Sequence, residues 1–299
     1  MTDGLEARIA TALARPVDPK VAAFATQLGV AQDALATVFY GSNLRTGSLE
    51  GVLDFYVLLP GPVERGIWPR VSYHEHDIDG VTLRAKVATM TLQTFAAAAA
   101  GETIDTTIWT RFVQPSALVY ARTPSARQAV TAAVCAAAQT GARVAVALGA
   151  PSASPEEYWR TLFRATYAAE FRVEKAGRED SILAVNREHF DGLLPLALIA
   201  QGIDFARGAQ GTLTPRLDPE RRQRLLRWWH RRRRAGRPYN LARLVKASTT
   251  FEGAARYAAW KIERHTGVAV PLTPWRERHP MLAAPGVLWK LWRAKRSRA

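Results

Sequence analysis

Residues 39–42 read Phe-Tyr-Gly-Ser, and residues 53–57 read Leu-Asp-Phe-Tyr-Val. The first stretch closes a short aromatic and β-branched segment, and Gly41 with its serine neighbour is a typical strand breaker. The second stretch belongs to a continuous apolar run over residues 52–59, which is interrupted only by Asp54. The length and the Val/Phe/Tyr content of this run favour a buried strand. The sequence therefore predicts two strands, with a Gly-Ser turn after the first and a carboxylate within the second.

These two segments carry the residue types that nucleotidyl transfer requires. Gly41 has no Cβ, so a phosphate can approach its backbone N–H, and the Ser42 hydroxyl can bond a phosphate oxygen. A carboxylate on the neighbouring strand can hold Mg²⁺, which prefers oxygen ligands and bridges phosphates. Asp54 would be costly to bury unpaired, so it needs a metal or a donor. A simple turn at Gly41 and an arginine-paired structural Asp54 remain the alternatives.

The rest of the chain predicts a mixed α and β first third and a mostly helical remainder. Apolar positions within residues 4–36 fall on one helical face, and residues 81–91 alternate loosely as one or two strands. From Ile108 onward the pattern is mostly helical, with an Ala-rich stretch over residues 125–147. Residues 154–157 combine a cap residue, a proline and two acids, which is how helices begin. The fold class is therefore α+β, with a mixed sheet flanked by helices before a mostly helical C-terminal region.

Three regions are expected along the chain. Residues 1–122 form the nucleotidyltransferase core with its nucleotidyltransferase-like sheet, and residues 123–207 form a helical region that completes the cleft. Residues 208–214 read as a linker because they are rich in Gly and Thr. Residues 208–299 form a basic, membrane-proximal helical region, which could take a winged-helix-like form.

Composition limits the partners and the cellular setting. The chain has 299 residues, with 41 Lys and Arg against 26 Asp and Glu, giving a formal charge of +15. This excess points to phosphates, nucleotides, nucleic acid or an acidic membrane surface. The single cysteine, Cys135, excludes an intrachain disulfide and a multi-cysteine zinc site. No spanning helix, secretory signal or transit peptide is expected from the hydropathy pattern.

Two segments combine tryptophan with positive charge. Residues 228–234 read Trp-Trp-His followed by four arginines, and residues 286–293 mix Trp, Leu, Lys and Arg. Such segments lie on anionic bilayers, where each basic residue contributes about 1 kcal/mol. The alternatives are a solvated charge run with core tryptophans, or nucleic-acid binding with tryptophans stacked on bases. No recognised nucleic-acid motif accompanies the charge, which argues against nucleic acid.

Taken in order, the segments resemble the mitochondrial-type phosphatidate cytidylyltransferases, also called the translocator assembly and maintenance protein family. The family's Tyr-Gly-Ser and Asp-Phe-aromatic-Val pattern is similar to residues 40–42 and 54–57. Its Lys-Tyr-Gly-Val-Ile-Ser strand looks like residues 86–91, and its Trp…Arg-Leu-Gln-Lys-Pro-Val segment looks like residues 109–115. Its Gly-Asp-Phe-Arg-Met block is similar to residues 169–173, where Glu170 replaces the family's aspartate. The resemblance spans most of the chain.

The resemblance implies a magnesium-dependent enzyme that converts CTP and phosphatidic acid to CDP-diacylglycerol and pyrophosphate. The Ala- and Arg-rich composition suggests a bacterial source, and the resemblance implies a cytoplasmic protein of phospholipid biosynthesis, bound peripherally to the inner face of the plasma membrane. An ordinary surface or ion-pair role remains the alternative for the basic residues of the site. The implied catalytic residues are Asp54, Lys86 and Glu170, the implied metal ligands are Asp54 and Glu170, and the implied nucleotide-binding residues are Tyr40, Gly41, Ser42, Lys86, Arg111 and Arg172.

Two other functions stay open from the sequence. The chain could be a nucleotidyltransferase with a different acceptor, such as a protein, a sugar phosphate or RNA. It could also be a catalytically inactive basic module that binds nucleic acid or a membrane.

Overall fold

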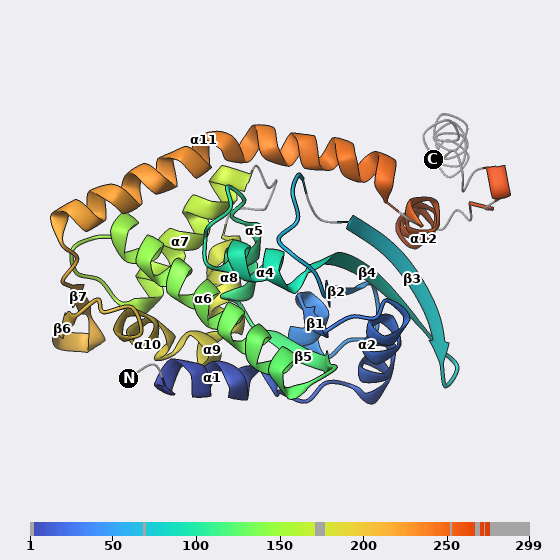
Figure 1. Cartoon of the computed structure of the whole chain (residues 1–299), viewed down its shortest axis with the longest axis horizontal. Helices are drawn as coiled ribbons and strands as arrows, with labels where there is room; N and C mark the ends of the chain where they lie inside the picture. The colour runs from blue at the N-terminus through green and yellow to red at the C-terminus, as the bar shows by residue number, and fades with distance from the viewer. Residues whose placement is uncertain are drawn as a thin grey trace.

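A five-stranded mixed sheet lies at one end of the protein, in the order β3-β4-β2-β1-β5 (Figure 1). This computed structural model describes residues 3–67, 70–170, 177–251, 253–266, 270–271 and 273–275. β1 runs antiparallel to β2 and β5, whereas β2 is parallel to β4, which pairs antiparallel with β3. The predicted α+β class is confirmed. The strands are β1 (Ala36–Tyr40), β2 (Leu53–Leu59), β3 (Arg70–Ile78), β4 (Val81–Thr91) and β5 (Ser116–Ala121).

Helices cover both faces of this sheet. Phe24 of α2 (Pro19–Ala31) packs against Phe55 on one face, with ring centroids 6.2 Å apart. On the other face Tyr56 joins a core cluster with three helices, which explains why β2 is apolar along nearly its whole length. These helices are α4 (Leu92–Ala99), α5 (Thr107–Phe112) and α6 (Pro124–Leu148).

The N-terminal segment differs from the expectation of helix throughout residues 4–36. It forms α1 (Asp3–Leu13) and α2, separated by an extended turn, and β1 already begins at Ala36. The Asp18 side chain accepts a hydrogen bond from the Lys20 backbone N–H at 2.8 Å, and Pro19 occupies the first helical position. A new helix starts at Pro19 because an N-cap residue followed by proline favours the start of a helix and disfavours the continuation of α1.

Several further elements were not expected from the sequence. β5 interrupts the region predicted to be mostly helical, and its pairing with β1 decides its conformation. β3 carries polar and charged residues, as edge strands commonly do. The stretch predicted to be flexible after Ser42 contains the short helix α3 (Ser42–Thr46). The predicted linker at residues 208–214 lies within a small hairpin formed by β6 (Phe205–Arg207) and β7 (Leu213–Pro215).

The middle of the chain is a helical layer packed on the sheet. α6 is long and apolar enough to cross a membrane, yet most of its apolar stretch is buried inside the protein. Trp109 and Trp159 join the sheet face to these helices in one core cluster, so residues 1–122 and 123–207 share a core. The proposed regional boundaries stay a prediction. The other helices of this layer are α7 (Pro155–Glu170), α8 (Arg178–Val185), α9 (Arg187–Phe190) and α10 (Leu193–Ile199).

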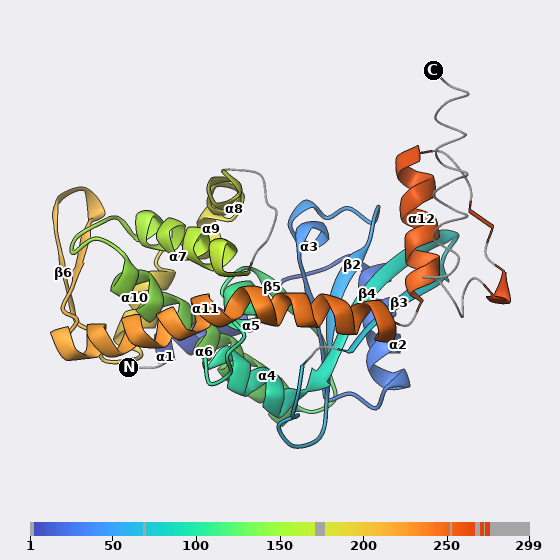
Figure 2. The same ribbon diagram turned by 90° about the horizontal axis from the view of Figure 1, so that it is seen from above.

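The long helix α11 (Pro219–Thr250) runs along the helical layer and reaches the sheet, where α12 (Ala254–Thr266) follows (Figures 1 and 2). Trp229 is buried, and Trp228 packs against Trp109 with ring centroids 6.2 Å apart. The guanidinium of Arg232 lies 3.6 Å from the Trp228 ring and donates to the Gly101 carbonyl at 2.7 Å. The core alternative therefore holds for Trp229, and the expected membrane-facing placement is wrong for that residue.

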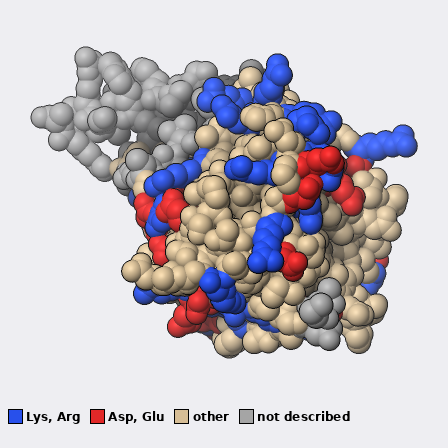
Figure 3. Space-filling view, turned by 90° about the vertical axis from the view of Figure 1, so that its left-hand side faces the viewer, with Lys and Arg blue, Asp and Glu red and all other residues tan. Residues whose placement is uncertain are grey.

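Several arginines of α11 are exposed, in contrast to the buried Arg232. Figure 3 shows the end of the protein near β6, where Lys and Arg side chains gather along the upper edge with acidic side chains among them. The basic segment at residues 286–293 lies outside the described residues. The exposed arginines of α11 include Arg222, Arg224, Arg227, Arg231, Arg233, Arg234 and Arg237.

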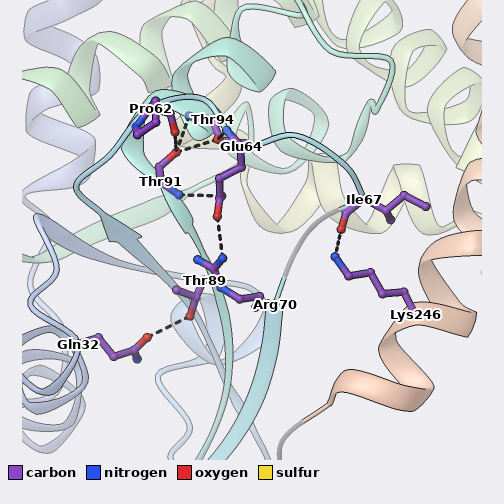
Figure 4. A network of polar contacts seen from close by, with 9 residues as sticks. All are labelled: Gln32, Pro62, Glu64, Ile67, Arg70, Thr89, Thr91, Thr94 and Lys246. Atoms are coloured by element: carbon purple, nitrogen blue, oxygen red, sulfur yellow. Dashed lines mark hydrogen bonds and ion pairs between the residues drawn. The ribbon is translucent and has the colours of Figure 1, made fainter.

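The end of α11 is tied to the loop between β2 and β3 (Figure 4). Lys246 donates a hydrogen bond to the backbone carbonyl of Ile67. The same loop is held from the other side by Glu64, whose carboxylate accepts from the Thr91 backbone N–H at 3.0 Å and from Arg70 at 2.8 Å. The C-terminal helices are thereby joined to the sheet at the edge formed by β3.

Candidate functional site

The Gly-Ser turn and Asp54 meet at one edge of the sheet. Tyr40, the last residue of β1, pairs with Asp54, the second residue of β2. Gly41 follows with φ 94° and ψ −161°, a conformation that L side chains rarely adopt. A Cβ at Gly41 would lie 3.0 Å from Asp54 Oδ2, so glycine lets the backbone pass directly over the carboxylate.

Asp54 belongs to a row of paired residues that crosses the whole sheet. Ser116, Tyr40, Asp54, Lys86 and Tyr73 are successive register partners on the five strands. Side chains at such positions share one face, so Tyr40 and Lys86 flank the carboxylate. Asp54 is half-buried and Lys86 is exposed. Among the described residues, none makes a hydrogen bond or an ion pair with the Asp54 carboxylate.

Arg111 reaches the same place from α5. Its Nη1 donates to the Tyr56 hydroxyl at 2.7 Å, and its guanidinium carbon lies 5.0 Å from the Tyr40 ring centre. Burial works against its charge, but the oxygens of Tyr40, Tyr56 and Asp54 outweigh this and keep the pKa of Arg111 above its usual value. The aromatic rings therefore hold a permanent cation near Asp54.

Burial raises the pKa of Asp54, while the positive charges of Lys86 and Arg111 pull it down. Desolvation by the surrounding protein lowers the pKa of Lys86. The negative charge of Asp54 raises this pKa, and the cations Arg111, Arg243 and Lys261 lower it further. Positive charge thus exceeds negative charge around Asp54. Such an environment attracts an anion with several charges.

Glu170 occupies a neighbouring buried position at the end of α7. Its carboxylate accepts from Thr106 Oγ1 at 2.7 Å, and it acts electrostatically on Arg111 and on Asp105. Its backbone carbonyl accepts from Asn240 of α11 at 2.8 Å. The structure therefore places Glu170 beside the start of α5, the helix that carries Arg111, and its role as a metal ligand stays a prediction.

The remaining predicted residues are placed less closely. Ser42 is exposed, and its hydroxyl lies 3.3 Å from Asn43 Oδ1. Arg172 lies outside the described residues. Three residues that the sequence analysis did not select also belong to this region, namely Tyr56, Asp105 and Arg243. The acid and threonines before α5 signalled only a helix start, and nothing in the sequence placed Arg243 beside the sheet.

The donor set agrees with a cation that is bound mainly through its substrate. The described residues contain no group of three or more His, Cys, Asp or Glu side chains suited to a metal ion. Mg²⁺ often uses only one or two carboxylates together with substrate phosphates and water. Asp54, half-buried under Gly41, fits that pattern.

Comparison with known proteins gives no assignment, since no protein-family model and no curated protein matches the chain.

The charge on Asp54 should cost stability. Its pKa is raised on folding, so the folded chain gives up this proton less readily than the unfolded chain, in which the pKa is near 3.8. The free energy of unfolding falls as pH rises above the pKa of the unfolded chain, and the full loss is reached above the pKa of the folded chain. Asp54→Asn should therefore melt at a higher temperature than the wild type at pH 7. The difference should narrow toward pH 4, as followed by circular dichroism; a lower melting temperature at pH 7 would contradict it.

Proposed function

We propose that the protein is a magnesium-dependent nucleotidyltransferase that transfers a cytidylyl group from CTP to phosphatidic acid. The observation that carries this proposal is the Asp54 carboxylate beneath Gly41, flanked by Lys86 and close to Arg111. The mixed sheet supports a nucleotidyltransferase-like fold, because the turn that ends β1 and the acid of β2 lie side by side. The order of the sequence blocks supports the choice of CTP and phosphatidic acid.

The reaction joins two anions that repel each other. An oxygen of the lipid phosphate attacks the α-phosphorus of CTP, a new P–O bond forms, and the bond to the β-phosphate oxygen breaks to release pyrophosphate. A phosphate monoester is already anionic near neutral pH, so a strong general base is not needed. Catalysis then depends on positioning and on neutralising charge.

The side chains around Asp54 suit these two tasks. Lys86 acts as a point charge, and Arg111 offers a planar fork whose orientation is set by the Tyr56 hydroxyl and the Tyr40 ring. Asp54 would hold Mg²⁺, which when bound supplies charge neutralisation on the phosphates. Gly41 leaves room for the nucleotide phosphates to approach the backbone.

The lipid acceptor requires contact with a membrane surface. The exposed arginines along α11 supply positive charge for an anionic bilayer, consistent with a peripheral protein at the inner face of the plasma membrane. The same charge would also suit nucleic acid, which the acceptor panel below tests directly.

The experiment that tests this function supplies each nucleoside triphosphate with Mg²⁺ and a panel of acceptors. Pyrophosphate release is expected only with CTP and vesicles that contain phosphatidic acid, and CDP-diacylglycerol should form in equal amount. Vesicles in which phosphatidylserine replaces phosphatidic acid are the control for surface charge. Transfer to a protein, a sugar phosphate or RNA would establish the other acceptor class. Calorimetry that detects no binding of Mg²⁺ and CTP would instead indicate an inactive binding module.

A further inference from the structure

Arg243 brings positive charge to the site from the C-terminal helix α11. Its Nη1 donates to Thr107 Oγ1 at 2.8 Å and lies 3.6 Å from Asp105 Oδ2. The side chain is half-buried, with about a quarter of its surface exposed. Thr107 precedes Arg111 by four residues on α5, so Arg243 lies beside the face of the helix that carries Arg111, and its charge also influences Lys86.

Asp105 is built to hold this arginine. It is 4% exposed, and its Oδ1 accepts from both the backbone N–H and the hydroxyl of Thr107, at 3.1 and 2.8 Å. Its Oδ2 is buried and has no hydrogen-bond partner among the described residues, with Arg243 the cation beside it. Because the hydrogen bonds to Oδ1 fix the orientation of the Asp105 carboxylate, the position of Oδ2 is also fixed. This limits where the Arg243 guanidinium can lie.

α11 is anchored on both sides of Arg243. Asn240, three residues before it, donates to the Glu170 carbonyl at 2.8 Å. Lys246, three residues after it, donates to the Ile67 carbonyl. The turn that follows α11 passes close to β3, because a Cβ at Gly253 would lie 2.9 Å from the Tyr73 carbonyl oxygen. The backbone that carries Arg243 is therefore fixed relative to the sheet.

Four cations from four elements lie in the region of Asp54, and two of them, Lys86 and Arg111, act on its carboxylate directly. Lys86 on β4 is influenced by Arg111 of α5, Arg243 of α11 and Lys261 of α12. Like charges held this close repel one another, and this costs folding free energy that a bound polyanion would offset. A chain of phosphates, with charges spaced a few bonds apart, matches such a cluster better than a single carboxylate or phosphate does.

We propose that Arg243 is a phosphate-binding residue of this site, that it contacts the phosphate chain of a polyphosphate substrate, and that Asp105 is its positioning residue. The identification of that chain as the triphosphate of CTP rests on the proposed function. Binding of a polyphosphate at these residues does not.

The test measures binding of inorganic tripolyphosphate to the full chain by calorimetry. Arg243→Gln should weaken binding about tenfold or more, since a hydrogen-bonded charge contact is lost. The affinity of Arg243→Lys should lie between those of the wild type and Arg243→Gln, because lysine keeps the positive charge and lacks the two-pronged guanidinium. Arg127→Gln is the matched control, the same change at an exposed position of α6, and should bind like the wild type. Circular dichroism melts show that each variant is folded.

The role of Asp105 is tested by a double-mutant cycle on the same binding signal. Asp105→Asn should weaken tripolyphosphate binding, and the double variant with Arg243→Gln should bind no worse than Arg243→Gln alone. Independent losses that add would show that Asp105 has only a structural role. The proposal is overturned if the wild type does not bind tripolyphosphate, or if Arg243→Gln and Arg127→Gln bind equally well. Tripolyphosphate binding that depends on Arg243, without cytidylyl transfer, would reject the proposed function and retain this site.

Discussion

Asp54→Asn is expected to lower CTP-dependent pyrophosphate release by about 1,000-fold. The substitution keeps the size of the side chain and removes the carboxylate that would hold Mg²⁺. Metal-based charge stabilisation contributes several kcal/mol, and each 1.36 kcal/mol is tenfold in rate, which gives roughly this factor. The flanking Lys86 and Arg111 stay in place and cannot replace an oxygen ligand. Initial rates at saturating CTP and phosphatidic acid measure the loss.

The fall in the rate of pyrophosphate release at low pH should follow the protonation of Asp54. Its pKa is raised by burial, so the carboxylate should protonate at a higher pH than a solvent-exposed aspartate, and the rate should fall as pH is lowered through that region. Glu102→Gln, at an exposed position, is the control and should match the wild type. Because Asp54→Asn should be at least as stable as the wild type at pH 7, unfolding cannot account for lost activity. A rate near that of the wild type would remove Asp54 from the mechanism.

Gly236→Ala should destabilise the protein by about 2 kcal/mol, against the usual effect of this substitution in a helix. Alanine normally gains about 1 kcal/mol over glycine at helix positions. At Gly236, however, the new Cβ would lie 2.4 Å from the backbone carbonyl oxygen of Ala169 in the last turn of α7. A backbone oxygen cannot rotate away, so α11 must move, and overpacking of this kind typically costs 1–3 kcal/mol or more.

The same shift should affect the site, because Glu170 follows Ala169 and Arg243 lies two turns further along α11. Urea unfolding measures the stability change, and tripolyphosphate calorimetry measures the loss of affinity. Gly4→Ala in α1 is the matched control, since its Cβ would meet only the end of the Leu196 side chain at 3.3 Å. Equal stability of Gly236→Ala and the wild type would show that α11 is not packed this tightly on α7.

Local sequence signals predicted the elements whose conformation depends on neighbouring residues. The apolar run of β2, the Ala-rich α6 and the cap and proline that begin α7 were all found at their observed positions. β5 was missed because its six residues gain their conformation by pairing with β1. The break between α1 and α2 was missed because apolar positions continue through it.

The sequence alone predicted that Gly41 and Asp54 lie near each other, because a strand, a turn and a second strand follow within a short stretch. The cations near them could not be predicted in this way, because they come from parts of the chain that meet only in the folded protein. The position of Lys86 beside Asp54 depends on the parallel register between β2 and β4. A shift of one residue would turn the Lys86 side chain to the opposite face of the sheet. The position of Arg243 depends on the course of α11, which runs back to the sheet. Contacts with α7 and with the β2–β3 loop fix this course, and they join residues that are far apart in the chain.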